Sequence, residues 1–151
     1  MRIRSVLSHS AQAVAEGALI SLLVVGLMAG TAFAAKGGKP SAGTGGSLNL
    51  ALVADANGNG AANWGDSLTF SPSTTSSDKP MVSLTCYQGS TVVYSHSAGF
   101  YPGYPWPASQ TFVLSSAAWA GGAADCTARG YYSNRHGGFV TFATQALHVD
   151  A

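Results

Sequence analysis

The sequence predicts an all-β protein: one antiparallel sandwich or barrel, preceded by an N-terminal export segment. Apolar and polar residues alternate with a period of two in several short stretches, and Gly, Pro, Asn and Ser clusters interrupt them about every 8 to 12 residues. The composition agrees, because only 9% of the residues are charged and 19 are glycines, as is typical of strands and turns. A disordered low-complexity chain is the alternative, and the many spaced aromatic residues argue against it.

The first 34 residues have the features of an export signal. Arg2 and Arg4 precede an uncharged apolar run over 18–35, and the Ala-Phe-Ala sequence at 32–34 supplies the small residues that a signal peptidase recognises. An uncleaved membrane anchor is the alternative, because the run approaches the length that spans a bilayer. Its glycine-rich second half favours cleavage. We therefore expect a signal peptide over 1–34, no membrane span after cleavage, and a secreted, extracellular protein.

Cleavage leaves about 117 of the 151 residues, enough for one domain with a modest core. We expect a flexible Gly/Ser-rich linker over 35–47 and one β-sandwich domain over 48–151. Five basic residues, five aspartates and no glutamate follow the signal, so the net charge is near zero. The absence of a basic cluster argues against a nucleic-acid partner.

Period-two alternation marks the expected strands of this domain. They fall at 47–54, 67–70, 81–88, 91–96, 110–115, 123–132 and 138–149. The apolar phase slips near 143–145, which predicts a β-bulge there.

The two cysteines that follow the signal are 40 positions apart, on the inward-facing phase of two of these strands. Because an exported protein meets an oxidising compartment, we expect a Cys86–Cys126 disulfide that joins the two sheets. Loop-closure entropy gives such a bridge about 4 kcal/mol. Two buried free thiols are the alternative.

The stretches around the cysteines resemble an immunoglobulin-like domain. VSLTCYQ (82–88) resembles the B strand, AADCTARGYY (123–132) resembles the F strand, and Trp119 lies where the E–F corner is expected. Three features differ from antibody domains: the cysteine spacing is shorter, the candidate C strand (91–96) has no tryptophan, and Ala124 replaces the usual tyrosine. The resemblance is therefore to bacterial secreted immunoglobulin-like sandwiches. It implies a binding or structural scaffold, while the fold alone assigns no function.

The segment DANGNGAANWGD (55–66) resembles the calcium loops of EF-hands and dockerins. Those loops supply oxygens from places 1, 3, 5, 7, 9 and 12, with glycine at the sixth place, here Gly60. The resemblance implies these ligands: Asp55, Asn57, Asn59, the backbone carbonyl of Ala61, Asn63 and Asp66. Only two of them are anionic, so the implied calcium site is weak and structural. A plain hairpin is the alternative, because Asn-Gly is a strong turn signal that needs no metal.

A proline-rich aromatic stretch, GFYPGYPWPAS (99–109), carries three candidate ligand-binding residues: Tyr101, Tyr104 and Trp106. Rings held on a stiff segment can stack on sugars or bury into a protein partner. Alternatively, these rings cover an open side of the sandwich.

A second polar stretch, YYSNRHGG (131–138), falls where an F–G loop is expected. Its candidates are Tyr132, Asn134 and Arg135, residue types that also populate antibody binding loops. We expect the turn at 88–90 to lie beside it at the same end of the domain. A polar hairpin turn without a ligand is the alternative.

No catalytic residue is predicted. The three histidines after the signal are not spaced for a zinc site, and the chain has no G-x-S-x-G motif. We expect a secreted, non-catalytic, immunoglobulin-like surface module for binding, adhesion or extracellular assembly, whose partner is an unidentified protein or glycan at the cell surface. The alternative is a carbohydrate-binding module that uses the aromatic stretch, and a small secreted hydrolase is a third possibility.

Overall fold

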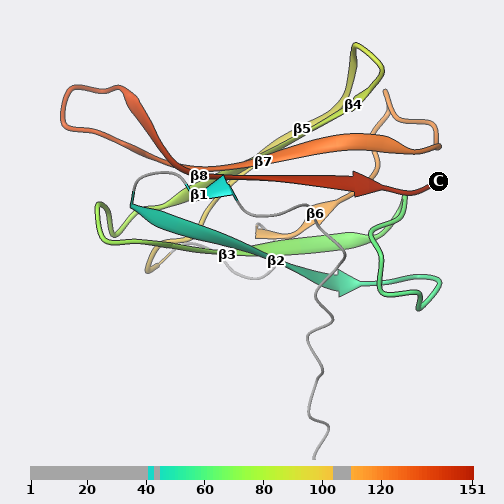
Figure 1. Ribbon diagram of the computed structural model, residues 1–151, viewed down its shortest axis with the longest axis horizontal. Helices are drawn as coiled ribbons and strands as arrows, with labels where there is room; N and C mark the ends of the chain where they lie inside the picture. Colours follow the sequence, from blue (N-terminus) through green and yellow to red (C-terminus); the bar gives the residue numbers. More distant parts are fainter. Residues whose placement is uncertain (1–40, 43–44, 104–109) are drawn as a thin grey trace, which may run out of the picture. The chain divides into compact units, whose positions relative to one another are not determined.

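A computed structural model describes residues 41–42, 45–103 and 110–151 (Figure 1). These residues belong to one compact unit, Thr31–Ala151. The predicted signal peptide lies outside them, as does most of the predicted linker, so both stay predictions. The described part of the chain has no helix long and apolar enough to cross a membrane.

Every stretch that the alternation predicts to be extended contains a strand. The strands are β1 (Ser41–Ala42), β2 (Gly46–Ala54), β3 (Ser67–Thr74), β4 (Met81–Gln88), β5 (Thr91–Gly99), β6 (Phe112–Val113), β7 (Ala124–Ser133) and β8 (Phe139–Val149). β1 and the first residues of β2 fall within the stretch predicted as linker.

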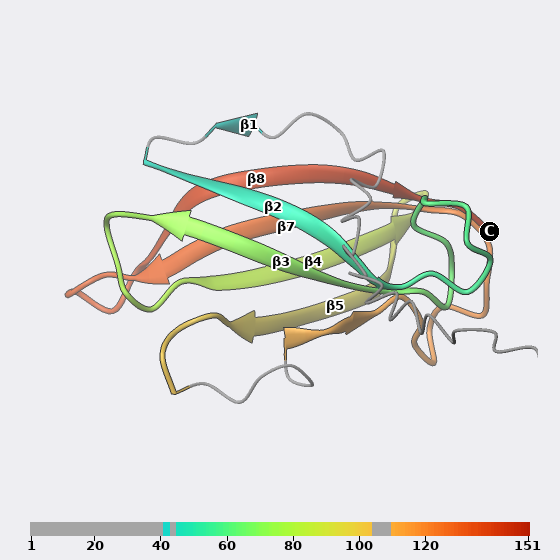
Figure 2. The ribbon, with the colours of Figure 1, turned by 90° about the horizontal axis from the view of Figure 1, so that it is seen from below.

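The strands form two antiparallel sheets that lie in two layers (Figures 1 and 2). One sheet has five strands in the order β1-β8-β7-β4-β5, and the other has three in the order β2-β3-β6. The predicted all-β fold with two antiparallel sheets is therefore confirmed.

The strand order is compatible with an immunoglobulin-like sandwich, in which strands A, B and E face G, F, C and C′. In that order β7 takes the place of strand F, as predicted. β4, which carries Cys86, takes the place of strand C, because it pairs with β7 in the same sheet. The assignment of residues 82–88 to strand B is therefore wrong.

The predicted disulfide between Cys86 and Cys126 is present. The two residues are directly opposite each other in β4 and β7, with their Cα atoms 3.9 Å apart. The bridge thus joins neighbouring strands of one sheet, and the expectation of an inter-sheet link is wrong. Alternation tells which face of a sheet a side chain occupies but not which strands are neighbours.

The two layers are held together by buried apolar side chains rather than by the disulfide. Leu48, Leu68 and Phe70 of the three-stranded sheet belong to the same buried cluster as residues of the five-stranded sheet, among them Leu84 and Phe142. Phe70 also meets Phe112 edge to face, with ring centroids 5.3 Å apart. Hydrophobic burial is therefore what closes the sandwich.

Trp119 is fully buried in the β6–β7 connection, the expected E–F corner. Its indole Nε1 donates to the carbonyl of Gly122 over 3.0 Å. The side chain of Gln88, at the end of β4, donates to the carbonyl of Gly121 over 2.8 Å. These bonds fix the connection against the five-stranded sheet.

The predicted bulge in β8 occurs one residue before the predicted stretch, at Phe142. The register between β7 and β8 shifts between Gly130 and Tyr131, so that Phe142 has no opposite residue. Its ring lies against Gly130, where an added Cβ would come within 2.6 Å of the ring Cζ. Glycine at 130 therefore makes room for the bulged ring.

Removal of the disulfide is expected to lower the free energy of unfolding by about 4 kcal/mol, because the bridge closes a loop of some 40 residues in the unfolded chain. Urea unfolding of the Cys86→Ala/Cys126→Ala variant checks this value against wild type. Reduced and alkylated wild type is the control and should match the double variant. Equal midpoints for oxidised and reduced protein would contradict the prediction.

Candidate functional site

Three chain segments meet at one end of the sandwich, here called the hairpin end (Figure 2). They are the β3–β4 loop (75–80), residues 100–103 after β5, and the β7–β8 hairpin (134–138). The backbone N–H of Phe100 donates to the carbonyl of Pro80 over 2.9 Å, which ties the second segment to the first. In an immunoglobulin-like sandwich these positions correspond to the end that carries the antigen-binding loops.

A hollow of about 490 Å³ opens among these segments. It is lined by Ser76, Ser77, Asp78, Lys79, Met81, Tyr101, Ser133 and Arg135. Two predicted ligand-binding residues, Tyr101 and Arg135, therefore line the same hollow although they come from different segments. We take this hollow as the candidate functional site and call it the hairpin-end hollow.

The other predicted residues of the hairpin have structural contacts. The Asn134 side-chain oxygen accepts hydrogen bonds from the backbone N–H groups of His136 and Gly138, each 2.9 Å long. Gly137 completes the turn with a φ of 77°, a conformation that glycine adopts readily. Tyr132 stacks on Phe142, with ring centroids 6.5 Å apart. Asn134 thus closes the turn and Tyr132 packs against the core.

The aromatic stretch is only partly described. Tyr101 lines the hairpin-end hollow and also a second hollow of about 400 Å³ beside β3. Tyr104 and Trp106 lie outside the described residues, so their predicted roles stay predictions. The turn at 88–90 lies at the opposite end of the sheet, because β4 runs away from the hairpin end, and its expected position beside the hairpin is wrong.

Charge is distributed unevenly between the two ends. Two of the three basic residues in the described part of the chain, Lys79 and Arg135, line the hairpin-end hollow together with one acid, Asp78. The other four described acids lie at the opposite end: Asp55, Asp66, Asp125 and Asp150. Neither Lys79 nor Arg135 has an ion-pair partner among the described residues.

The predicted calcium loop connects β2 to β3, and its two carboxylates bind backbone amides. Asp55 accepts hydrogen bonds from the N–H groups of Gly58 and Gly60, both 2.8 Å long. The bond from Gly60 is the main reason why the pKa of Asp55 is lowered. Asp66 is only 1% exposed and accepts from the N–H groups of Ala56 and Asn63, at 2.9 and 2.8 Å.

The asparagines of the loop have similar partners. Asn57 Oδ1 accepts from the N–H of Asn59 over 3.1 Å, and Asn59 Oδ1 accepts from the N–H of Ala61 over 2.8 Å. Asn59 Nδ2 donates to Asn63 Oδ1 over 3.0 Å. Gly60, at the sixth place, has a φ of 74°. These bonds explain the spacing of the oxygen-bearing side chains as a means of satisfying the amides of an irregular loop.

Calcium binding by this loop stays a prediction. Within the described ranges no three His, Cys, Asp or Glu side chains form a group that could hold a metal ion. Calcium loops also use asparagine and backbone oxygens, so this finding does not test calcium. Both carboxylates already accept two backbone hydrogen bonds each, and any metal would share these oxygens with the amides.

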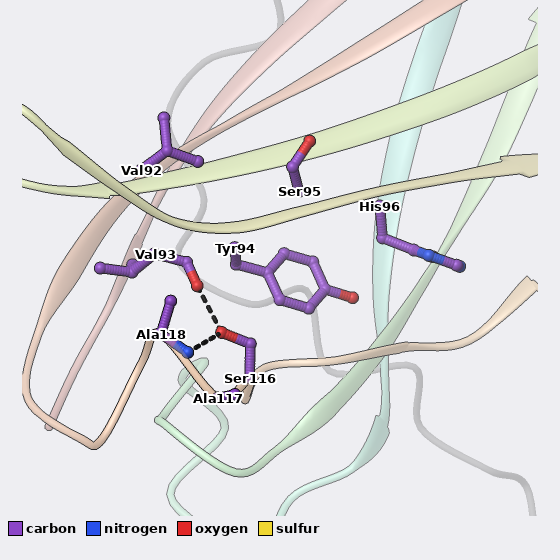
Figure 3. A pocket seen from close by; sticks show the side chains of 8 residues that line it. All are labelled: Val92, Val93, Tyr94, Ser95, His96, Ser116, Ala117 and Ala118. Atoms are coloured by element: carbon purple, nitrogen blue, oxygen red, sulfur yellow. Dashed lines mark hydrogen bonds between the residues drawn. The ribbon is translucent and has the colours of Figure 1, made fainter.

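A third hollow, of about 410 Å³, runs along the edge strand β5 and was not foreseen (Figure 3). Ser116, from the β6–β7 connection, donates its hydroxyl to the carbonyl of Val93 and accepts from the N–H of Ala118. Tyr94 contacts Trp119, and His96 contacts Phe112, both edge to face. Burial raises the pKa of Tyr94 to about 12, so its phenol stays protonated into the alkaline range where an exposed tyrosine ionises. The rings of Tyr94 and His96 thus cover the seam between the two sheets. Covering an open side of the sandwich is also the alternative role for the aromatic stretch at 99–109.

An exposed contact on the outer face of the five-stranded sheet was also missed. His148 Nδ1 lies 2.7 Å from Asp125 Oδ1. Both side chains are largely exposed, and exposed pairs of this kind contribute little to stability. Each residue is unremarkable in the sequence, and only the pairing of β7 with β8 brings them together.

Replacement of Asp66 by alanine is expected to lower the free energy of unfolding by about 2 to 4 kcal/mol, because one buried and one partly buried amide lose their acceptor. Chemical unfolding monitored by tryptophan fluorescence measures the change. Asp125→Ala is the matched control and should cost less than about 1 kcal/mol, because Asp125 is exposed. Similar losses of unfolding free energy in Asp66→Ala and Asp125→Ala would contradict a structural role of the buried Asp66 carboxylate.

The calcium prediction implies a melting temperature that rises only at millimolar calcium, as expected for a weak extracellular site. Scanning calorimetry with calcium, with magnesium and with a chelator tests it. The rise should be specific for calcium and absent from the Asp55→Ala variant. Identical melting curves in calcium and chelator would leave the loop with its hydrogen-bonding role alone.

No protein-family model matches the chain, and no curated protein or solved structure is significantly similar to it.

Proposed function

We propose that this protein is a secreted, non-catalytic surface module of the immunoglobulin-like type, and that it binds its partner through the hairpin-end hollow. The observation that carries this proposal is the convergence of three separate chain segments around one hollow. Its lining combines an aromatic ring, two cations and several hydroxyl groups. Side chains on loops at the end of a rigid sandwich are a common arrangement for recognition.

The framework around the hollow favours binding because it is held in place before a partner arrives. The Asn134 side chain closes the β7–β8 hairpin from within. β7 itself pairs along its length with β4 on one side and β8 on the other. A site formed in advance loses less conformational entropy on binding than one that must be ordered.

The covalent structure supports the secreted part of the proposal. Disulfides persist mainly in oxidising environments such as the extracellular space, and this protein has one between Cys86 and Cys126. The predicted signal peptide over 1–34 and the low charge content point in the same direction.

Carbohydrate binding is the second candidate, favoured by the position of Tyr101. Because this residue lines both the hairpin-end hollow and the hollow beside β3, an extended ligand could contact it from either side. Aromatic side chains provide flat apolar surfaces on which the faces of sugar rings pack. The predicted roles of Tyr104 and Trp106 would extend the same surface.

Replacement of Tyr101 by alanine is expected to weaken binding about tenfold or more, because a central aromatic anchor is lost. A panel of immobilised polysaccharides and of cell-surface protein fractions, probed with wild type and variant, measures retention. Tyr87→Ala is the control and should bind normally, because Tyr87 is an exposed tyrosine at the far end of β4. Normal retention of Tyr101→Ala with loss in Tyr87→Ala would move the binding site to the outer face of the sheet.

A further inference from the structure

The chemistry of the hairpin-end hollow narrows the class of ligand. Lys79 and Arg135 contribute two positive charges and Asp78 one negative charge, so the lining has a net positive charge. The hydroxyl groups of Ser76, Ser77 and Ser133 supply uncharged donors and acceptors. Tyr101 and Met81 supply the apolar surface.

The distribution of charge over the domain acts in the same direction. The opposite end carries four of the five described acids. A negative end and a positive hollow together favour the approach of an anion to the hairpin end rather than to the other end. The two cations have no ion-pair partner among the described residues, so an incoming anion would not have to displace one.

We propose that the hairpin-end hollow binds a saccharide that carries a carboxylate, such as a uronic acid unit of an acidic polysaccharide. This inference rests on the proposed binding function of the same hollow. Arg135 and Lys79 pair with the carboxylate, since a guanidinium can bind both of its oxygens. The Asp78 carboxylate accepts hydrogen bonds from the sugar hydroxyls, the serine hydroxyls both donate and accept them, and Tyr101 packs against the ring.

An acidic peptide fits the hollow less well. Peptides commonly bind by adding a strand to an open sheet edge, whereas β4 and β7, which border the hollow, each already pair with a strand on both sides. Peptide anchors also need apolar pockets, and six of the eight lining residues here are serine or charged side chains. The density of small polar groups favours a ligand rich in hydroxyls.

The test compares three uronate polymers, polygalacturonate, alginate and hyaluronan, with their carboxyl-reduced forms. Titration calorimetry with the mature chain is expected to show binding to at least one uronate polymer, at least about tenfold tighter than to its reduced form. Arg135→Gln and Lys79→Gln should each weaken this binding about tenfold, as expected for the loss of one charged contact. Arg129→Gln is the matched control and should bind like wild type, because Arg129 lies midway along β7 and stacks on Tyr131 outside the hollow.

Several outcomes would overturn the inference. One such outcome is equal affinity for the acidic and reduced polymers, with binding lost in Tyr101→Ala but not in Arg135→Gln. It would show that the hollow binds a saccharide but does not recognise its carboxylate. Equal loss in Arg129→Gln and Arg135→Gln would indicate unspecific charge attraction. Salt-sensitive self-association that Arg135→Gln abolishes, measured by sedimentation without polymer, would assign the hollow to the acidic end of a second copy. Absence of binding to all three uronate polymers would also overturn the inference. The proposed binding function is tested separately: it fails only if Tyr101→Ala changes the retention of the protein on none of the polysaccharides and cell-surface protein fractions.

Discussion

The register of β4 against β7 is the constraint on which the rest of the structure depends. Cys86 and Cys126 are directly opposite each other, and their bond prevents these two central strands from sliding past one another. A slip of one residue would turn Val82 and Leu84 from the core to the solvent. The same register brings the start of β4 and the end of β7 to one end of the sheet. The loops that border the hairpin-end hollow therefore meet as a consequence of the arrangement that builds the core.

Cohesion between the layers has a different origin. No disulfide joins the two sheets in the described part of the chain, since its two cysteines are bonded within one sheet. The sheets are held by apolar burial, and the open places of the sandwich are covered by aromatic side chains. Trp119 fills the end that carries the β6–β7 connection, while Tyr94 and His96 cover the seam beside β5. The disulfide restricts the conformations of the unfolded chain and fixes the register of β4 against β7. The buried side chains provide the attraction between the layers.

Much of this architecture could be predicted from the sequence, because alternation reports directly on burial. The strands, the inward cysteines and the position of Trp119 all follow from local patterns. Neighbour relations do not, since a period of two identifies a face but not the adjacent strand. For that reason local patterns reveal neither that β4 pairs with β7 in one sheet nor that the turn at 88–90 lies opposite the hairpin end. The site shows the same division: Tyr101 and Arg135 could each be selected by residue type, but only the topology shows that they line one hollow.

The polar residues of the two ends differ in their hydrogen-bond and ion-pair partners. This difference distinguishes residues with a structural role from residues that are candidates for binding a partner. At the end that contains residues 55–66, the polar side chains turn toward their own loop. Asp55, Asp66 and Asn59 accept hydrogen bonds from amides that would otherwise lack partners. Asn134 does the same within the hairpin. Lys79 and Arg135, in contrast, have no ion-pair partner among the described residues although they border the same hollow. An asparagine or aspartate in a turn is explained by the fold, whereas no ion pair among the described residues explains why Lys79 and Arg135 line one hollow, a role that an anionic partner would give them.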